Sequence, residues 1–163
     1  MAETLVLYFS RSGMTATLAQ ELAKKLGASL GRVTPTASYA GPGGYLKGVW
    51  QALRGEAPPV EPSGDISRYA LVVIGSPVWA GRLSPPMRSC LRGVRGRIEG
   101  VGAFWVSGSG APYRAVGAEV ERLTGKAPVA TAAFSQREVV RGATDAKLEA
   151  LAKALGAVER PAA

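Results

Sequence analysis

The sequence of 163 residues contains no histidine and a single cysteine, Cys90. Without histidine, the Ser-His-Asp and Cys-His arrangements of nucleophilic catalysis are excluded, and a zinc or copper site is disfavoured. One cysteine cannot form a disulfide within the chain, which favours a reducing compartment. We therefore expect a cytoplasmic protein that holds no metal.

Long apolar runs are also missing. None approaches the ~18 residues of a membrane-spanning helix, and residues 1–10 (MAETLVLYFS) lack the basic start of a secretory signal. The composition, 47% hydrophobic and 20% charged, is typical of a globular protein. We expect no membrane contact, and one domain over residues 1–163 with its core at about 4–156 and a frayed C-terminal tail.

Acidic residues are scarce. The chain has 12 of them and 20 lysines and arginines, which gives a net charge of +8. The imbalance is greatest between residues 66 and 118, where Glu99 is the one acidic residue among many arginines. A surface of this kind favours acidic partners. Aromatic residues are few and are not interleaved with the basic ones, which argues against nucleic acid as the partner. The arginines of this segment are Arg68, Arg82, Arg88, Arg92, Arg95, Arg97 and Arg114.

Apolar segments and helical patterns alternate along the chain. The predicted strands are 5–9, 70–75, 102–107, 129–134 and, more weakly, 29–33. The predicted helices are 14–26, 45–53, 86–94, 113–123 and 145–155, and residues 37–44 and 55–64 are predicted loops. Five strand–helix repeats predict an α/β fold: a doubly wound, five-stranded parallel sheet in the order 2-1-3-4-5 with helices on both faces.

In such a sheet, ligands lie beyond the carboxyl ends of the strands, where the strand order reverses. The loops at that place are SRSGMT (10–15), SPVWAGRLSPP (76–86) and SGSGAPY (107–113). The first combines hydroxyls, a glycine and the N-terminus of a helix, whose unpaired N–H groups bind a phosphate without help from a lysine. Walker A and dinucleotide-binding motifs are both missing. These loops predict a site for a phosphorylated ligand.

The three loops resemble those of the flavodoxin family. YFSRSGMT (8–15) is similar to the family's phosphate loop, VVIGSPVWAGRLSPPMRSCL (72–91) to the loop along the flavin ring, and SGSGAPY to the loop at the ring's pyrimidine edge. The resemblance covers residues 5 to about 155, without the last-strand insertion of long-chain flavodoxins. It implies a short-chain flavodoxin-like protein with FMN as its cofactor.

The resemblance also implies which residues hold the FMN. Met14 replaces the usual asparagine and would contribute its backbone N–H, while Arg11 could reach the phosphate but is expected to extend into solvent. Ala80 stands where related sequences often have a second tryptophan. The phosphate set is Ser10, Arg11, Ser12, Gly13, Met14 and Thr15; the isoalloxazine set is Pro77, Val78, Trp79, Ala80 and Gly81; the pyrimidine set is Ser107, Gly108, Ser109, Gly110 and Tyr113.

Other apolar residues at helical spacing are interpreted as core. Cys90 is expected to be a small buried residue, and Trp105 a core aromatic. One helix is expected to have Met87, Cys90, Leu91 and Val94 on its apolar face and Arg88, Arg92 and Arg95 on the opposite one. A second helix is expected to bury a stripe of Tyr45, Val49, Trp50 and Leu53, or to use it in an oligomer contact.

No titratable residue of the three loops has the character of a catalytic acid or base, so no catalytic residue is predicted. The chain is expected to be an FMN-binding, flavodoxin-like protein that carries electrons between redox partners, rather than a substrate-specific oxidoreductase. The alternatives are an NAD(P)H-dependent quinone or flavin reductase on the same fold, and a flavin-free interaction module that acts through its arginine-rich face. The expected partner is an acidic redox protein or an NAD(P)H-dependent reductase, and the chain a monomer or dimer.

Overall fold

The computed structural model of the chain describes residues 3–36, 38–56 and 65–159. A parallel sheet runs through its centre in the order β2-β1-β3-β5-β6, and the short β4 pairs antiparallel with β3. This is the predicted order 2-1-3-4-5, with β4 as an addition. The strands are β1 (Thr4–Tyr8), β2 (Ser29–Arg32), β3 (Leu71–Trp79), β4 (Arg82–Leu83), β5 (Gly100–Ser107) and β6 (Thr131–Ser135).

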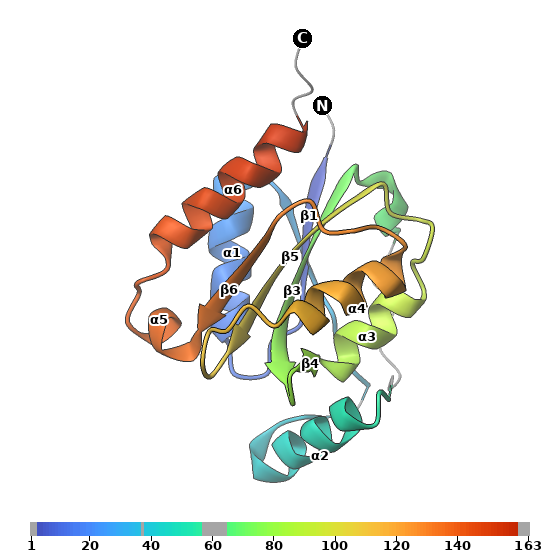
Figure 1. Ribbon diagram of the computed structural model, residues 1–163, viewed down its shortest axis with the longest axis vertical. Coiled ribbons are helices and arrows are strands. Elements are labelled where there is room, and N and C mark those ends of the chain that lie inside the picture. Colours follow the sequence, from blue (N-terminus) through green and yellow to red (C-terminus); the bar gives the residue numbers. More distant parts are fainter. Residues whose placement is uncertain (1–2, 37, 57–64, 160–163) are drawn as a thin grey trace.

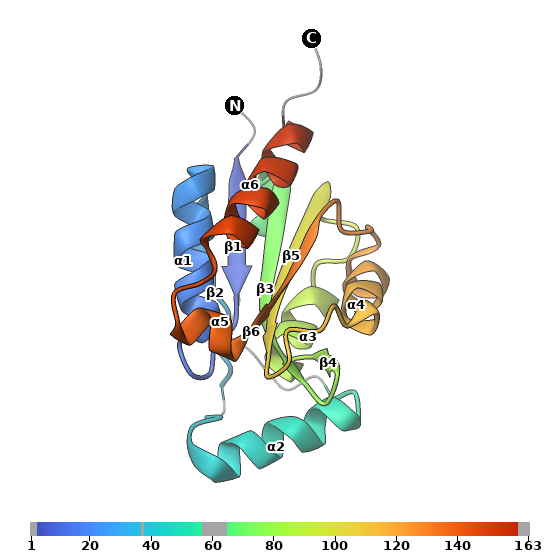
Figure 2. The ribbon, with the colours of Figure 1, turned by 60° about the vertical axis from the view of Figure 1, so that its left-hand side comes forward.

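Helices cover both faces of the sheet (Figures 1 and 2). Helices α1 and α6 lie on one face and α3 and α4 on the other, while α2 lies apart from both layers, beyond the carboxyl ends of the strands. The helices are α1 (Met14–Leu26), α2 (Gly41–Leu53), α3 (Pro85–Arg92), α4 (Arg114–Thr124), α5 (Gln136–Val140) and α6 (Asp145–Glu159), with a 3₁₀ turn at Ile66–Arg68.

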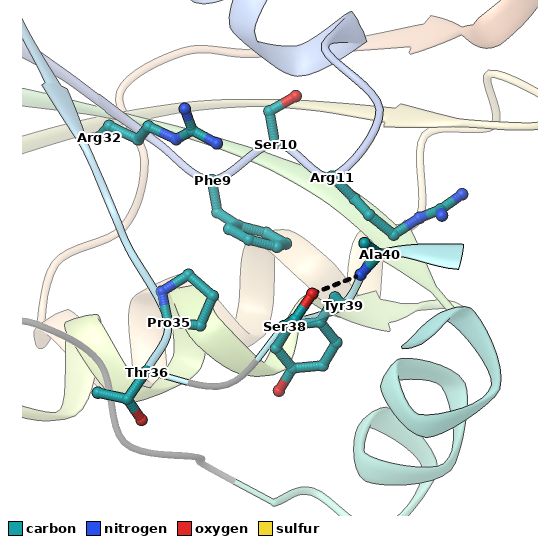
Figure 3. Close-up of a pocket in the computed structure, with 9 residues that line it drawn as sticks. All are labelled: Phe9, Ser10, Arg11, Arg32, Pro35, Thr36, Ser38, Tyr39 and Ala40. Atoms are coloured by element: carbon teal, nitrogen blue, oxygen red, sulfur yellow. Dashed lines mark hydrogen bonds between the residues drawn. The ribbon is translucent and has the colours of Figure 1, made fainter. Parts of the chain in front are cut away.

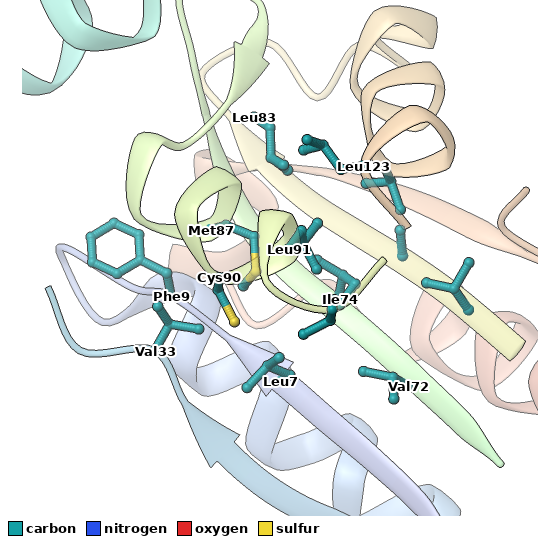
Figure 4. Packing of buried hydrophobic residues seen from close by; sticks show 14 of the residues in the cluster. Leu7, Phe9, Val33, Val72, Ile74, Leu83, Met87, Cys90, Leu91 and Leu123 are labelled. Carbon is teal, nitrogen blue, oxygen red and sulfur yellow. The ribbon is translucent and has the colours of Figure 1, made fainter. Parts of the chain in front are cut away.

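Two apolar cores result, one on each face of the sheet. Alternate residues of β1 divide between them: Leu5 and Leu7 point to the α3/α4 side, and Val6 and Tyr8 to the α1/α6 side. Figure 4 shows Leu7 in the first core, below the side chains of α3. Burial on both faces explains why the central strands β1, β3 and β5 are mostly apolar in the sequence.

The structure corrects several sequence predictions about the elements. The second helix begins at Gly41, with a proline in its first turn, so residues 41–44 are helical rather than loop. The short elements β4 and α5 were not predicted. Most of the predicted loop 55–64 and of the predicted frayed tail lies outside the described residues. No helix in the ranges that the structure describes is long and apolar enough to cross a membrane.

Two predictions about side chains are wrong. The core interpretation of the α2 stripe fails, because Tyr45, Trp50 and Leu53 are exposed and α2 contacts the rest of the molecule through its small residues; the alternative, an oligomer contact, stays a prediction. Arg88 is buried rather than on the solvent face of its helix. Cys90 and Trp105 are buried as predicted.

Candidate cofactor site

The first loop joins β1 to α1 and has the geometry of an anion cradle. Gly13 adopts a φ of +94°, in the left-handed region that favours glycine, and its N–H donates to the hydroxyl of Ser10 at 3.0 Å. The first helical hydrogen bond runs from the Thr17 N–H to the Gly13 carbonyl at 3.0 Å. The N–H groups of Met14 and Thr15 therefore have no partner within the helix and point out of its N-terminus.

A cavity of about 220 Å³ lies in front of this N-terminus. It is formed by all three predicted loops, together with residues from α2 and from the start of α5. The carboxyl ends of β1, β3 and β5 therefore meet at one cavity, as the topology predicts. Its lining is Arg11, Ser12, Met14, Thr15, Tyr45, Pro77, Val78, Trp79, Val106, Gly108 and Gln136.

Three of the lining residues were not predicted from the sequence. Tyr45 belongs to the exposed part of α2, and Val106 to the end of β5. Gln136 opens α5, whose N-terminal Ser135 and Glu138 form a reciprocal capping box. The pattern Ser-x-x-Glu at positions 135–138 is the sequence signal that could have located α5, and with it Gln136.

Among the described residues that line the cavity, Arg11 is the one with a charged side chain. It is exposed, as expected, but its guanidinium carbon lies 5.2 Å from the centre of the Tyr45 ring. A cation–π contact of this kind holds a positive charge at the rim of the cavity. Arg11 is thus placed to attract an anion, although its side chain faces solvent.

The second loop is a tight hairpin between β3 and β4. Trp79 pairs with Arg82, and the two residues of the turn, Ala80 and Gly81, have φ values of +52° and +70°, as in a type I′ turn. The turn divides the predicted isoalloxazine set. Residues 77–79 line the cavity, whereas Ala80 and Gly81 line a neighbouring one on the other side of the hairpin.

Trp79 forms a buried wall of the cavity. Its ring centre lies 5.7 Å from that of Phe9 and 5.6 Å from that of Tyr39. Helix α2 covers the indole at Gly48, where a Cβ atom would lie 2.5 Å from the ring atom Cζ3. A side chain at this position would therefore push α2 away from Trp79.

The third loop is held by its own hydroxyls. The Ser107 hydroxyl accepts from the Gly110 N–H at 2.8 Å, and the Ser109 hydroxyl lies 3.3 Å from that of Tyr113. Tyr113 has a φ of +34°, which is strained for a side chain of its size. Of the predicted pyrimidine set, Gly108 lines the cavity, whereas Ser107, Ser109, Gly110 and Tyr113 are not among its lining residues. A Cβ on Gly81 would lie 3.8 Å from the Tyr113 ring, so the second and third loops are neighbours.

A buried ion pair supports the hairpin from behind. Arg88 donates to Glu119 of α4 through Nε, to the Leu83 carbonyl at 3.2 Å and to the Glu56 carbonyl at 2.9 Å. The Glu119 carboxylate in turn accepts from the Leu83 N–H at 3.3 Å. Both polar groups of the Leu83 backbone are thereby fixed, and so is the hairpin that carries the second loop. Arg88 therefore stabilises the hairpin and does not belong to the exposed cationic surface.

A second cavity, of about 410 Å³, adjoins the first loop between the ends of β1 and β2. Figure 3 shows the ring of Phe9, one of the lining residues, between Arg32 and Tyr39. Burial raises the pKa of Tyr39, and the nearby Glu56 raises it further, so the phenol keeps its proton at neutral pH. Arg11 lines both cavities.

The chain matches no protein-family model and no curated protein sequence, but it is similar to many solved structures. A flavoprotein from Lactobacillus acidophilus, solved in complex with FMN, is 23% identical over 86% of this chain and 98% of its own, with a TM-score of 0.69. Flavodoxin 2 from Bacillus cereus is 16% identical over 95% and 98%, with a TM-score of 0.57. This chain has the flavodoxin fold.

A third structure shares the flavodoxin fold with this chain. It is a flavodoxin, WrbA-like protein from Agrobacterium tumefaciens, 13% identical over 94% of this chain and 96% of its own, with a TM-score of 0.54. The predicted fold class is thus confirmed. At these identities the likeness concerns the flavodoxin fold alone, and the predicted role of each loop residue stays a prediction.

Proposed function

We propose that this flavodoxin-fold chain binds FMN and carries electrons between redox partners. The observation that carries the proposal is the phosphate cradle of the first loop, where Gly13 turns the chain and the N–H groups of Met14 and Thr15 face a cavity at the switch point of the sheet. The L. acidophilus flavoprotein, solved with FMN, supports the choice of ligand.

The residues present fit a phosphate ester. Hydroxyls of Ser12 and Thr15 and unpaired backbone N–H groups are neutral donors, and Arg11 adds one positive charge at the rim. The volume of about 220 Å³ is below the ~300–1,000 Å³ of pockets that enclose a drug-sized ligand. It suits the phosphate and ribityl part of FMN, which would leave the ring next to residues 77–79 and Gly108. FMN, when bound, supplies the electron transfer, and the protein sets its access and potential.

The lining of the cavity favours electron carriage over group chemistry. Among the described residues that line it there is no carboxylate, lysine or cysteine that could act as a general acid, base or nucleophile. A reductase would also need an open pocket above Trp79, but α2 covers that ring at Gly48. We include a cytoplasmic location in the proposal on the basis of the single cysteine, which is buried.

Two glycines at opposite ends of α1 provide the test. Gly13 and Gly27 both have positive φ, +94° and +62°, and a Cβ would contact nothing within 4 Å at either. G13A and G27A should therefore cost similar stability, about 1–2 kcal/mol. G13A can relieve its strain by moving the first loop. This movement would take the N–H groups of Met14 and Thr15 away from the position of the FMN phosphate.

We expect G13A to weaken FMN binding about tenfold, which corresponds to ~1.4 kcal/mol, and G27A to leave it unchanged. Quenching of flavin fluorescence on titration measures both dissociation constants. Riboflavin, which lacks the phosphate, should bind weakly and equally to all three proteins. Equal FMN affinity of G13A and the parent chain, or equal affinity of the parent for FMN and riboflavin, would contradict the proposed cradle.

A further inference from the structure

The exposed face of α2 carries an unusual stripe of large apolar side chains. Leu46, Trp50 and Leu53 are 66%, 60% and 56% exposed, and their spacing of i, i+4 and i+7 places them on one side of the helix. The small residues Gly48 and Ala52 bury the opposite side. Apolar residues grouped in this way mark an interaction site more often than scattered ones do.

A cationic pocket lies on the hairpin next to this stripe. Its volume is about 460 Å³, and Arg82, Arg92 and Arg122 line it with exposed side chains. Glu119 is the one acidic residue of the lining, and its carboxylate is already engaged by the buried Arg88. The Glu119 carboxylate oxygen Oε1 makes only a long contact of 3.9 Å with the Arg122 guanidinium. Among the residues that the structure describes, Arg82 and Arg92 form no ion pair, and Arg122 has only this long one, so little of their positive charge is compensated there.

The stripe and the pocket are continuous at the end of α2. Gly55, two residues after Leu53, lines the pocket, and Arg92 donates to its carbonyl at 3.5 Å. The Arg54 guanidinium lies over the Trp50 ring at 5.6 Å. We name the stripe of Leu46, Trp50 and Leu53, together with Arg82, Arg92 and Arg122, the docking face.

The docking face lies close to the cofactor cavity. Ala80 and Gly81 line the cationic pocket, whereas residues 77–79 of the same hairpin line the cofactor cavity. One hairpin thus separates the two. A protein seated on the docking face would approach the proposed flavin without entering its cavity.

We propose that the docking face binds an acidic electron-transfer protein, whose carboxylates surround an apolar patch. This inference rests on the proposed function. Tryptophan and arginine are the residue types that anchor protein interfaces, and an apolar centre with a charged rim is the usual arrangement. A second copy of this chain fits less well, because it would bring the three arginines against three more.

The probe for the test is an acidic [2Fe–2S] ferredoxin. The FMN-loaded chain is mixed with the reduced ferredoxin in a stopped-flow instrument, and flavin absorbance is followed. Each electron lost by a reduced cluster is gained by the flavin. The variants are R92E, with K24E as an exposed control of equal charge change on α1, and W50S, with V129S as a control at an exposed valine before β6.

We expect R92E to slow flavin reduction about tenfold at low ionic strength, and salt to remove most of the difference from the parent chain. W50S should slow the reaction at every ionic strength, whereas K24E and V129S should have little effect. Equal slowing by R92E and K24E, or none by R92E and W50S, overturns the proposal.

A binding measurement separates this proposal from the proposed function. Trp79 and Trp105 are buried, so a blue shift of tryptophan emission on adding oxidised ferredoxin reports on Trp50, with or without flavin. If the chain retains no FMN but shows this shift, and W50S abolishes it, the docking face stands and the proposed function fails. Loss of a self-association by W50S in sedimentation, or binding of duplex DNA that R92E abolishes, would assign the face to another occupant and overturn the proposal.

Discussion

Helices α1 and α2 are both 13 residues long, and both carry apolar residues at helical spacing. Helix α1 buries five side chains, including Leu18 and Leu22, between β1 and α6. Helix α2 buries only Gly48 and Ala52, and exposes its large residues. Two similar patterns therefore have opposite environments.

The difference shows what helical spacing determines and what it does not. The pattern places side chains on a common face, but the connection decides what that face meets. Helix α1 returns along the sheet as a crossover between β1 and β2, so its apolar face reaches the core. Helix α2 lies beyond the carboxyl ends of the strands, where it meets Trp79 and the neighbouring β4 and α3 rather than a face of the sheet. One helix builds the fold, and the other presents a surface.

The largest test of this contrast is a matched pair of leucine truncations. L22A should lower the free energy of unfolding by about 3 kcal/mol, because Leu22 is fully buried and leaves a cavity. L53A should change it by less than ~0.5 kcal/mol, because Leu53 is mostly exposed. Urea denaturation followed by circular dichroism gives both values. A cost for L53A close to that for L22A would show that α2 is packed against more than the structure shows.

A second pair of variants tests the contact between α2 and the Trp79 ring. G48A should destabilise the chain by ~1–3 kcal/mol, because the new methyl group would lie 2.5 Å from the Trp79 ring. G43A, in the same helix with no atom within 4 Å of its Cβ, should be neutral or stabilising by up to ~1 kcal/mol. Thermal melts compare the two. Trp79 emission should shift to the red in G48A alone, and similar behaviour of the two variants would refute the contact.

The smallest expected effect concerns the ion pair of Glu138 in α5, the short helix that packs against α1. Glu138 belongs to the capping box at the N-terminus of α5, and its carboxylate pairs with Lys147 at 2.7 Å. Bonds from Lys147, and then from the Ser135 backbone, hold the pKa of Glu138 below its ordinary value of 4.5. A folded pKa below the unfolded one stabilises the protein above the unfolded pKa, and this stabilisation is lost as pH falls through the folded value.

E138Q keeps the capping box, because glutamine also serves in it, but removes the charge. We expect E138Q to lower the free energy of unfolding by about 0.5 kcal/mol at pH 7, and this difference from the parent chain to disappear as the pH falls below 4.5. Urea unfolding of both proteins between pH 3 and 7, in steps of ~0.5 pH units, measures this difference. A loss that stays constant over this range would mean that the charge of Glu138 does not contribute.

The strands and the cofactor loops were predictable because they depend on short-range patterns, and the strand order because right-handed crossovers leave few arrangements. A continuous apolar run such as 71–74 indicates a strand buried on both faces, and Gly13 before a helical pattern indicates a turn into an N-terminus. The burial of Arg88 was not predictable, because its partners Glu56 and Glu119 lie 32 and 31 residues away in the sequence. The capping pattern at 135–138 could have assigned Gln136 to a helix, but Tyr45 and Gln136 reach the cavity through the placement of α2 and α5 in space, which no local pattern encodes.

Arg88 also determines which parts of the molecule can open independently. Its guanidinium bonds the segment after α2, strand β4 and helix α4, so separating any one of them leaves a buried charge with unpaired donors. These three segments should therefore exchange their amide hydrogens as one cooperative unit. The far end of α2, which Arg88 does not reach, is left to fluctuate on its own.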